Sequence, residues 1–252
     1  MSTDTFKDHF SGHAIDYANA RPHYPAALFD WLASLTSQHD LAWDCGTGNG
    51  QAAVALAKHY SHVVATDASK TQIANAFSHA TVEYRVAPAE QTTLESGCVD
   101  LVTVAQAAHW FDLPAFYQEV RRVAKPGAVL ALWCYGLCKI SPEVDAVIMG
   151  FYEGESAAYW PPERSLVDAG YSTLPFEFSE IEPASISMIR EWTLHQFLGY
   201  LNTWSAVQRY IKQTGHDPMP ALAASLGRAW GAPKKAHEVI WPLYVRAGWV
   251  AG

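Results

Sequence analysis

Short apolar runs alternate with helix-like runs over the first half of the chain. The apolar runs have the length and β-branched content of buried strands, and they lie at 41–44, 63–66, 81–86, 99–104 and 128–133. The runs before and between them have helical spacing and lie at 26–34, 52–60, 69–77 and 113–124. Strands that alternate with helices predict an α/β fold with a doubly wound, mostly parallel sheet and right-handed crossovers.

The pattern changes in the second half of the chain. Two late runs complete a predicted sheet of seven strands, and they lie at 176–181 and 238–245. Between them, residues 195–214 have the spacing of one long helix with an apolar face, and a shorter helical run follows at 221–230. We therefore predict that residues 195–230 form a helical insertion between the late strands, which acts as a lid over a ligand site.

Length and composition fit one globular domain over residues 1–252. Half of the residues are hydrophobic and 17% are charged, which allows a sizeable core. Residues 1–36 end in a helical pattern and are predicted to form an N-terminal helical cap segment. No run approaches the roughly 20 apolar residues that span a bilayer, and residues 1–7 lack the apolar centre of a signal peptide. We expect a cytoplasmic protein with no membrane partner.

Charge and cysteine content narrow the class of ligand. The net charge is −8, and the 17 basic residues are scattered, without the basic stripe that follows a nucleic-acid backbone. The four cysteines have no paired metal-ligand spacing and are expected to be free thiols in a reducing compartment. The sequence therefore predicts no nucleic-acid partner and no metal.

A glycine-rich turn follows the strand at 41–44. Glycine lets the backbone approach a ligand closely, and the amides of the next helix face whatever lies over the turn. A strand, such a turn and a helix predict a nucleotide-type pocket at the carboxyl end of a parallel sheet. The dinucleotide pattern G-x-G-x-x-G would place its third glycine where Gln51 stands. This difference counts against a nicotinamide cofactor.

The spacing G-x-G-x-G after an acidic residue resembles the first motif of class I S-adenosylmethionine-dependent methyltransferases. Further segments resemble the small-molecule branch similar to trans-aconitate methyltransferase, and they lie at 10–25, 87–90, 106–111 and 200–205. The resemblance covers essentially the full chain. It implies the Rossmann-like methyltransferase fold, S-adenosylmethionine as cofactor with S-adenosylhomocysteine as its product, and a small-molecule acceptor. By resemblance this acceptor is a carboxylic acid that becomes a methyl ester.

The resemblance also implies contacts to the cofactor. The residues of the turn under its methionine part are Asp44, Gly46, Thr47, Gly48 and Gly50. Asp67, at the end of the second strand, accepts hydrogen bonds from the ribose hydroxyls, with a helix cap as the alternative. Ala89 and Glu90 lie in the loop that reaches the adenine, and Glu90 is equally well explained as a solvated charge.

Tyr17 and Arg21 lie four residues apart and share one face if their segment is helical. A guanidinium is a fork that fits a carboxylate, and the methionine end of the cofactor carries a carboxylate. The resemblance implies that Arg21 holds this group and that Tyr17 covers the sulfonium. A surface ion pair is the alternative for Arg21.

Three residues after the fourth strand lie beside the expected site of methyl transfer. The resemblance assigns Gln106 to the cofactor, and Trp110 either stacks on the cofactor, lines the acceptor site or packs in the core. His109 is the candidate catalytic residue, as a general base, a substrate contact or a structural histidine. A carboxylate acceptor is already ionised and needs no base, so we assign His109 to acceptor positioning.

Later residues are candidates for the acceptor site. Arg164 and Arg209 are candidates to bind an anionic acceptor, with solvated surface as the default for each. Aromatic candidates for its lining are Trp133, Tyr135, Tyr159, Trp160, Tyr200 and Trp204. The cofactor supplies the electrophile of methyl transfer, so no nucleophile–base–acid triad is needed. Two alternatives remain open: a non-catalytic protein that binds S-adenosylmethionine or S-adenosylhomocysteine, and a nicotinamide-dependent oxidoreductase.

Overall fold

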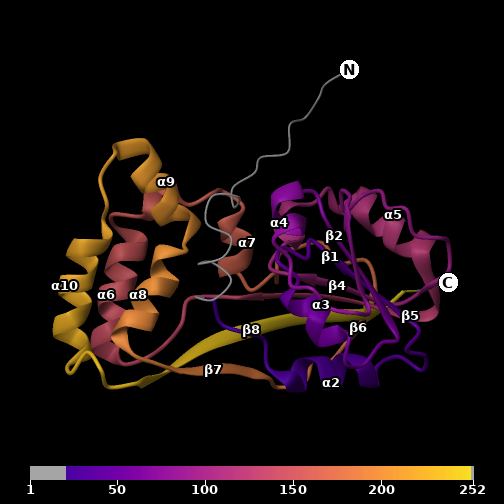
Figure 1. Cartoon of the computed structure of the whole chain (residues 1–252), viewed down its shortest axis with the longest axis horizontal. Helices are drawn as coiled ribbons and strands as arrows, with labels where there is room; N and C mark the ends of the chain where they lie inside the picture. The colour runs from indigo at the N-terminus through magenta and orange to yellow at the C-terminus, as the bar shows by residue number, and fades with distance from the viewer. Residues whose placement is uncertain (1–20, 251–252) are drawn as a thin grey trace.

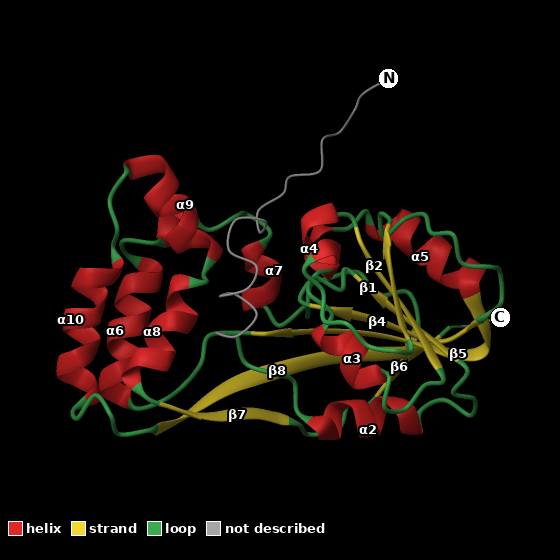
Figure 2. Cartoon of the chain, viewed as in Figure 1, coloured by secondary structure: helices red, strands yellow, loops and turns green. Residues whose placement is uncertain are grey.

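The computed structural model describes residues 21–250, and its larger part is a twisted sheet with helices on both faces (Figures 1 and 2). The strands are β1 (Leu41–Cys45), β2 (His62–Asp67), β3 (Val82–Val86), β4 (Val99–Ala105), β5 (Ala124–Tyr135), β6 (Ser179–Ile181), β7 (Ser187–Trp192) and β8 (His237–Trp249). The helices are α2 (Ala26–Ser34), α3 (Gln51–Leu56), α4 (Lys70–Ala74), α5 (Leu113–Val123), α6 (Pro142–Glu153), α7 (Arg164–Asp168), α8 (Leu194–Asn202), α9 (Ser205–Thr214) and α10 (Met219–Trp230). Two single 3₁₀ turns are η1 (Ala108–Trp110) and η2 (Ala157–Tyr159).

The strand order is β3-β2-β1-β4-β5-β8-β6. The strands from β3 to β5 are parallel, and β8 is antiparallel to β5. The prediction of a doubly wound, mostly parallel sheet of seven strands is therefore confirmed, with β7 as an additional strand that pairs with β8 alone. The sequence did not predict β7, because apolar and polar residues do not alternate along it, although the burial of its side chains does.

The last strand belongs to both halves of the molecule. Residues 243–249 of β8 pair with β5, whereas residues 237–242 pair with β7. Pro242 stands at the junction and has no N–H to donate to a ladder. Figure 1 shows β8 as a long yellow strand that extends from the sheet toward α6, α8 and α10.

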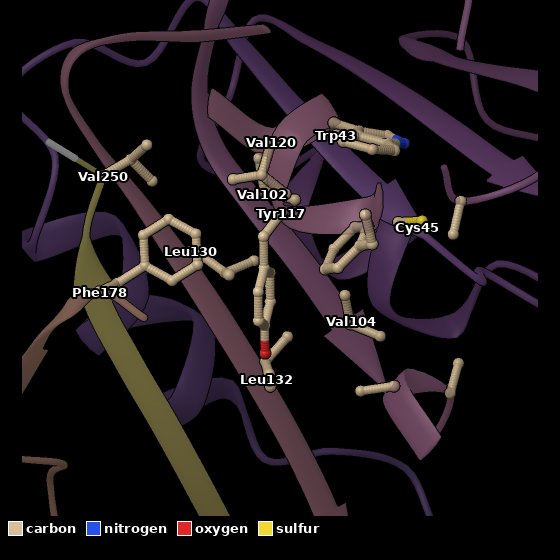
Figure 3. Packing of buried hydrophobic residues seen from close by; sticks show 14 of the residues in the cluster. Trp43, Cys45, Val102, Val104, Tyr117, Val120, Leu130, Leu132, Phe178 and Val250 are labelled. Carbon is tan, nitrogen blue, oxygen red and sulfur yellow. The ribbon is translucent and has the colours of Figure 1, made fainter. Parts of the chain in front are cut away.

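Alternation along the central strands divides the core of the sheet into two faces. In β5, Leu130 and Leu132 belong to one hydrophobic cluster, whereas Val129 and Ala131 belong to the other, as the period of two in a strand requires. Helix α5 covers the first cluster, with Tyr117 packed over Leu130 and Leu132 (Figure 3). Helices α2 and α3 cover the second cluster.

A third hydrophobic cluster lies between α6, α8 and α10 and the strands β7 and β8. Tyr135, the last residue of β5, belongs to this cluster. The carboxyl end of β5 therefore reaches the helices, which gather at one end of the molecule in Figure 1. Helix α7 lies between them and the sheet, where it contacts η1.

The predicted continuous helix over 195–214 is wrong. The chain forms α8 and α9 instead, which are separated at Thr203 and Trp204. The backbone of Trp204 is extended, and its ring is only 4% exposed because it packs against Tyr152 and Trp160. Burial of this large ring outweighs the helical spacing of the sequence.

The helices α8 to α10 follow β7 and precede β8 in the chain, and α6 packs beside them against α10. Their function as a lid, the extent of the insertion at 195–230 and the cap segment at 1–36 stay predictions, and most of that cap lies outside the described residues. Among residues 21–250, no helix has the length and apolarity needed to cross a membrane.

We expect Leu130→Ala to lower the free energy of unfolding by about 2–5 kcal/mol, because the side chain is fully buried in the middle of β5 and leaves a cavity. Ile189→Ala on β7, where the side chain is 43% exposed, is the control and should cost about 1 kcal/mol or less. Urea denaturation measures both values. Equal losses in the two variants would contradict the position of the core.

Candidate active site

The glycine-rich turn connects β1 to α3, and its three glycines are all left-handed. Their φ angles are 67° at Gly46, 57° at Gly48 and 86° at Gly50. A β-carbon at Gly46 would lie 2.6 Å from the β-carbon of Ala107, so the loop after β4 requires glycine there. A β-carbon at Gly48 would meet no atom within 4 Å. The backbone at Gly48 is therefore open to a ligand.

A buried carboxylate fixes the shape of this turn. The Asp44 side chain lies in β1 and is fully buried. Its Oδ2 accepts a hydrogen bond from the hydroxyl of Thr47 at 2.5 Å, and its Oδ1 accepts one from the hydroxyl of Thr103 at 2.8 Å. Burial raises the pKa of Asp44 to about 6, although both hydroxyls oppose the shift. Both oxygens are thus occupied inside the protein, and Asp44 acts on the site through the turn.

The carboxylate at the end of β2 lies directly beside the turn. Asp67 Oδ2 accepts from the backbone amide of Gly48 at 2.9 Å, and Oδ1 accepts from the amide of Ser69 at 2.8 Å. Ser69 is the predicted N-cap of α4 and accepts from the amide of Gln72. A carboxylate at this position, beside the glycine-rich turn, is compatible with the predicted ribose contact.

The loop after β3 contains the residues predicted to reach the adenine. Ala89 is buried, with 8% of its surface exposed. The Glu90 carboxylate accepts a hydrogen bond from the backbone amide of Asp112 at 3.0 Å, and Asp112 caps the start of α5. Glu90 is thus tied to α5 as well as being a partly exposed charge.

The chain leaves β4 through a strained residue. Gln106 has a φ of 55°, although it is not glycine. Its amide donates to the carbonyl of Trp133 at 2.9 Å, and its Nε2 donates to the carbonyl of Tyr135 at 3.4 Å. Its Oε1 is buried and accepts no hydrogen bond from the residues at 21–250. A buried carboxamide oxygen without a partner is a candidate contact for a ligand.

His109 follows in η1 and is bonded to a residue that the sequence did not indicate. Its Nδ1 lies 2.7 Å from the hydroxyl of Tyr171, and its ring lies 4.7 Å from that of Trp110. Burial, together with the charge of Arg164, lowers the pKa of His109 to about 3. The imidazole is therefore neutral near pH 7 and a poor proton acceptor, which favours the hydrogen-bonding roles over the general-base role.

Arg21 lies at the carboxyl end of β5, where it contacts Tyr135. Its Nη1 donates to the hydroxyl of Tyr135 at 3.2 Å, and its Nη2 donates to the carbonyl of Thr203 at 3.5 Å. It therefore connects the sheet edge with the junction of α8 and α9, rather than forming only a surface ion pair. Tyr17, its predicted neighbour in the site, lies outside the described residues.

Sequence reasoning missed Thr103 and Tyr171 of this region, and for Arg164 it left open whether the side chain binds an anionic acceptor or is solvated. Thr103 pairs in register with Asp44 across β1 and β4, and a single hydroxyl in an apolar strand could have indicated it. Arg164 had solvated surface as its default interpretation, but its side chain is only 18% exposed. Tyr171 follows α7 and gave no signal. Among residues 21–250, no group of three or more His, Cys, Asp or Glu is placed to hold a metal ion.

The parallel sheet with its late antiparallel strand, the glycine-rich turn after β1 and the carboxylate after β2 define a Rossmann-like methyltransferase. Residues 43–132 match the family described as "Methyltransferase domain". The chain is 37% identical over 247 residues to a protein of Dictyostelium discoideum named as a methyltransferase, which covers 95% of this chain and 94% of that protein. It is 31% identical over 254 residues to a Schizosaccharomyces pombe protein also named as a methyltransferase, over 93% of this chain and 95% of that protein.

A solved structure from Anaeromyxobacter dehalogenans, named as a type II methyltransferase, is 48% identical with a TM-score of 0.86. The match covers 92% of this chain and 98% of that chain. The chain therefore belongs to the class I S-adenosylmethionine-dependent methyltransferases, and its cofactor is S-adenosylmethionine. This family membership excludes the nicotinamide-dependent alternative.

Two glycine variants should separate folding from cofactor binding. Gly48→Ala adds a methyl group in open space at a left-handed residue, so it should cost about 1–2 kcal/mol of stability but obstruct the ligand. Gly46→Ala adds the overlap with Ala107 and should cost roughly 1–3 kcal/mol more. Urea denaturation and calorimetric titration with S-adenosylmethionine measure the two effects. Undiminished cofactor affinity in Gly48→Ala would contradict the placement of the ligand over this glycine.

The free energy of unfolding should depend on pH through the titration of Asp44. The folded-state pKa of about 6 lies above the ordinary value of 3.8, so the protonated form is favoured in the folded state and this contribution is lost as pH rises toward and past 6. Relative to Asp44→Asn, the free energy of unfolding should fall by about 2 kcal/mol between pH 4.5 and pH 7. Denaturation of both proteins at the two pH values tests this, and parallel pH profiles would refute it.

Proposed function

We propose that the protein methylates a carboxylate oxygen of a small carboxylic acid, as in the branch similar to trans-aconitate methyltransferase. The observation that carries this proposal is the guanidinium of Arg164, which is mostly buried beside His109. In the reaction, a carboxylate oxygen forms a bond to the methyl carbon while the bond from that carbon to sulfur breaks. The products are a methyl ester and S-adenosylhomocysteine, and no proton is transferred.

Arg164 has an edge suited to a carboxylate. Its Nε donates to Asp168 at 2.9 Å and to the hydroxyl of Tyr152 at 3.0 Å. Its central carbon lies 4.7 Å from the ring centre of Trp160 and 5.4 Å from that of Tyr152. No hydrogen bond to a described residue uses the two terminal nitrogens. This pair can donate in parallel to two carboxylate oxygens.

A second donor lies next to Arg164. The indole Nε1 of Trp160 is buried and has no hydrogen-bond partner in the part of the chain that the structure describes. A buried N–H without a partner is unfavourable in the free protein, and a bound oxygen acceptor would relieve this cost. The rings of Tyr152, Trp160 and Trp204 pack against one another within about 6 Å of centre-to-centre distance. Aromatic walls with a few donors suit a small organic anion.

The state of His109 supports an acceptor that arrives already ionised. A histidine with a pKa of about 3 removes no proton from an alcohol or an amine near pH 7. A carboxylic acid, with an ordinary pKa of about 4, is ionised without help. The neighbouring Arg164 favours this anion, because its positive charge opposes protonation of the imidazole and stabilises a carboxylate.

The residues of the turn fit S-adenosylmethionine. The open backbone at Gly48 leaves room for its chain, and the carboxylate of Asp67 lies beside it, bonded to the Gly48 amide. When bound, the cofactor supplies an electrophilic methyl group on a sulfonium. Arg21, at the end of β5, is proposed to hold the cofactor's carboxylate. The protein then contributes binding, alignment of donor and acceptor, and exclusion of water.

The proposal is tested with tritiated S-adenosylmethionine and a panel of mono-, di- and tricarboxylic acids that includes trans-aconitate. Mild base should release the label from the product as methanol, which a methyl ester allows and an N-methyl group or an ether does not. Labelled products that resist base would overturn ester formation.

Arg164→Lys keeps the positive charge and loses the fork, so we expect kcat/KM for the best acid to fall by roughly tenfold to a hundredfold. The affinity for S-adenosylmethionine should stay unchanged. Arg228→Lys is the matched control, because Arg228 lies at the exposed surface of α10, where it donates a hydrogen bond to Ser225. An unaffected kcat/KM in Arg164→Lys would contradict the role of Arg164.

A further inference from the structure

Two strained residues flank η1. Among the residues that the structure describes, Gln106 and Tyr171 are the two non-glycine residues with positive φ, at 55° and 58°. Bulky side chains avoid this region of backbone space. Such conformations persist where the surrounding structure enforces them, and they cluster at functional sites. Gln106 precedes η1 in the chain, and Tyr171 contacts it through His109.

Several contacts hold Tyr171 in this conformation. It follows Gly170, which is also left-handed with a φ of 59°. Its amide donates to the carbonyl of Leu166 at 2.9 Å, and its carbonyl accepts from Nη1 of Arg246 at 3.2 Å. The side chain is fully buried in the cluster under α5. The end of α7 and the strand β8 therefore fix the phenol against η1.

The surroundings of this phenol bear on the tautomer of His109. The backbone amides of Ala108 and His109 favour a negative charge on the oxygen of Tyr171, so the phenol proton is expected to point away from these N–H groups. The phenol proton is then available to Nδ1 of His109, 2.7 Å away. Burial raises the pKa of Tyr171 well above its ordinary value, so this proton stays in place near neutral pH.

A neutral imidazole that accepts at Nδ1 carries its own proton on Nε2. No hydrogen bond from Nε2 to a described residue is formed. The charged group that faces this ring is Arg164 of α7, and its charge opposes protonation of the ring. His109 is thus available as a neutral N–H donor in front of α7.

We propose that Tyr171 is a positioning residue, which holds His109 as the Nε2–H tautomer so that the ring donates a hydrogen bond to the methyl acceptor. This inference rests on the proposed function for the identity of the acceptor. A carboxylate held at one oxygen by a neutral donor keeps its charge, and its second oxygen keeps a lone pair for attack on the methyl group even while it accepts from Arg164. Without the phenol, the ring could rotate or shift its proton to Nδ1 and present a lone pair that repels the carboxylate.

The tautomer is measured without any ligand, by long-range ¹⁵N–¹H correlation spectra of protein labelled at histidine nitrogen. The His109→Gln variant identifies the signals of His109. We expect an unprotonated Nδ1 and a protonated Nε2 in the unmodified protein, and a mixture of tautomers or a reversed one in Tyr171→Phe. A protonated Nδ1 in the unmodified protein, or an unchanged tautomer in Tyr171→Phe, would overturn the proposal.

Tyr117→Phe is the matched control. It removes another phenol from the same cluster, whose hydroxyl donates to the carbonyl of Pro175 at 2.6 Å and makes no contact with His109. The His109 spectrum of this variant should match that of the unmodified protein. A tautomer change in Tyr117→Phe as large as in Tyr171→Phe would mean that loss of core packing, rather than the hydrogen bond, sets the ring, and would count against the proposal.

Activity measurements distinguish which nitrogen of His109 contacts the acceptor. The substrate for them is the acid of the panel that is methylated fastest. Glutamine places its amide N–H near the position of Nε2, whereas asparagine places it near Nδ1, so His109→Gln should retain about tenfold more kcat/KM than His109→Asn. The affinity for S-adenosylmethionine should be equal in both. The reverse order would refute the assignment of Nε2. If no acid is methylated while the spectra agree, the proposed acceptor fails and the tautomer assignment stands.

Discussion

The hydrogen bonds of the Asp44 carboxylate hold together the carboxyl ends of the strands at the candidate site. It lies in the dry interior between β1 and β4, where one oxygen holds Thr47 of the turn and the other holds Thr103 of the neighbouring strand. Because both hydrogen bonds go to the same carboxylate, they fix the position of the turn relative to strand β4. The left-handed glycines that follow can then adopt a fixed path, and the Gly48 amide meets Asp67 of β2. One buried charge thereby aligns three strand ends.

Most of the sheet could be predicted from local features of the sequence. Strands such as β1, β2 and β4 are apolar runs bounded by turns, and burial on both faces demands that pattern. The turn at 46–50 could be recognised because left-handed backbone and close approach leave little choice but glycine. Strand β7 could not be recognised, because apolar and polar residues do not alternate along it and it is held by pairing with the distant β8.

The same distinction applies to the candidate site. Asp67 ends an apolar run in the sequence, so its place at the carboxyl end of β2, beside the turn, could be predicted. The break between α8 and α9 depends on the ring of Trp204 meeting residues about 50 positions earlier in the chain. The bond between His109 and Tyr171 spans a separation of 62 residues. No periodicity encodes such encounters, because they depend on how α7 packs against η1.

The division of β8 between two partners has a consequence for motion. A helical layer attached by loops alone could swing on a hinge, but this one is attached through a continuous strand. Residues 243–249 of that strand pair with β5, and residues 247–249 pair with β6 as well. Rigid-body opening would have to bend β8 where Pro242 interrupts its hydrogen bonding. The connection between the sheet and the helices is therefore a continuous strand and not a flexible hinge. A change in the relative orientation of the sheet and the helices therefore requires deformation of this strand.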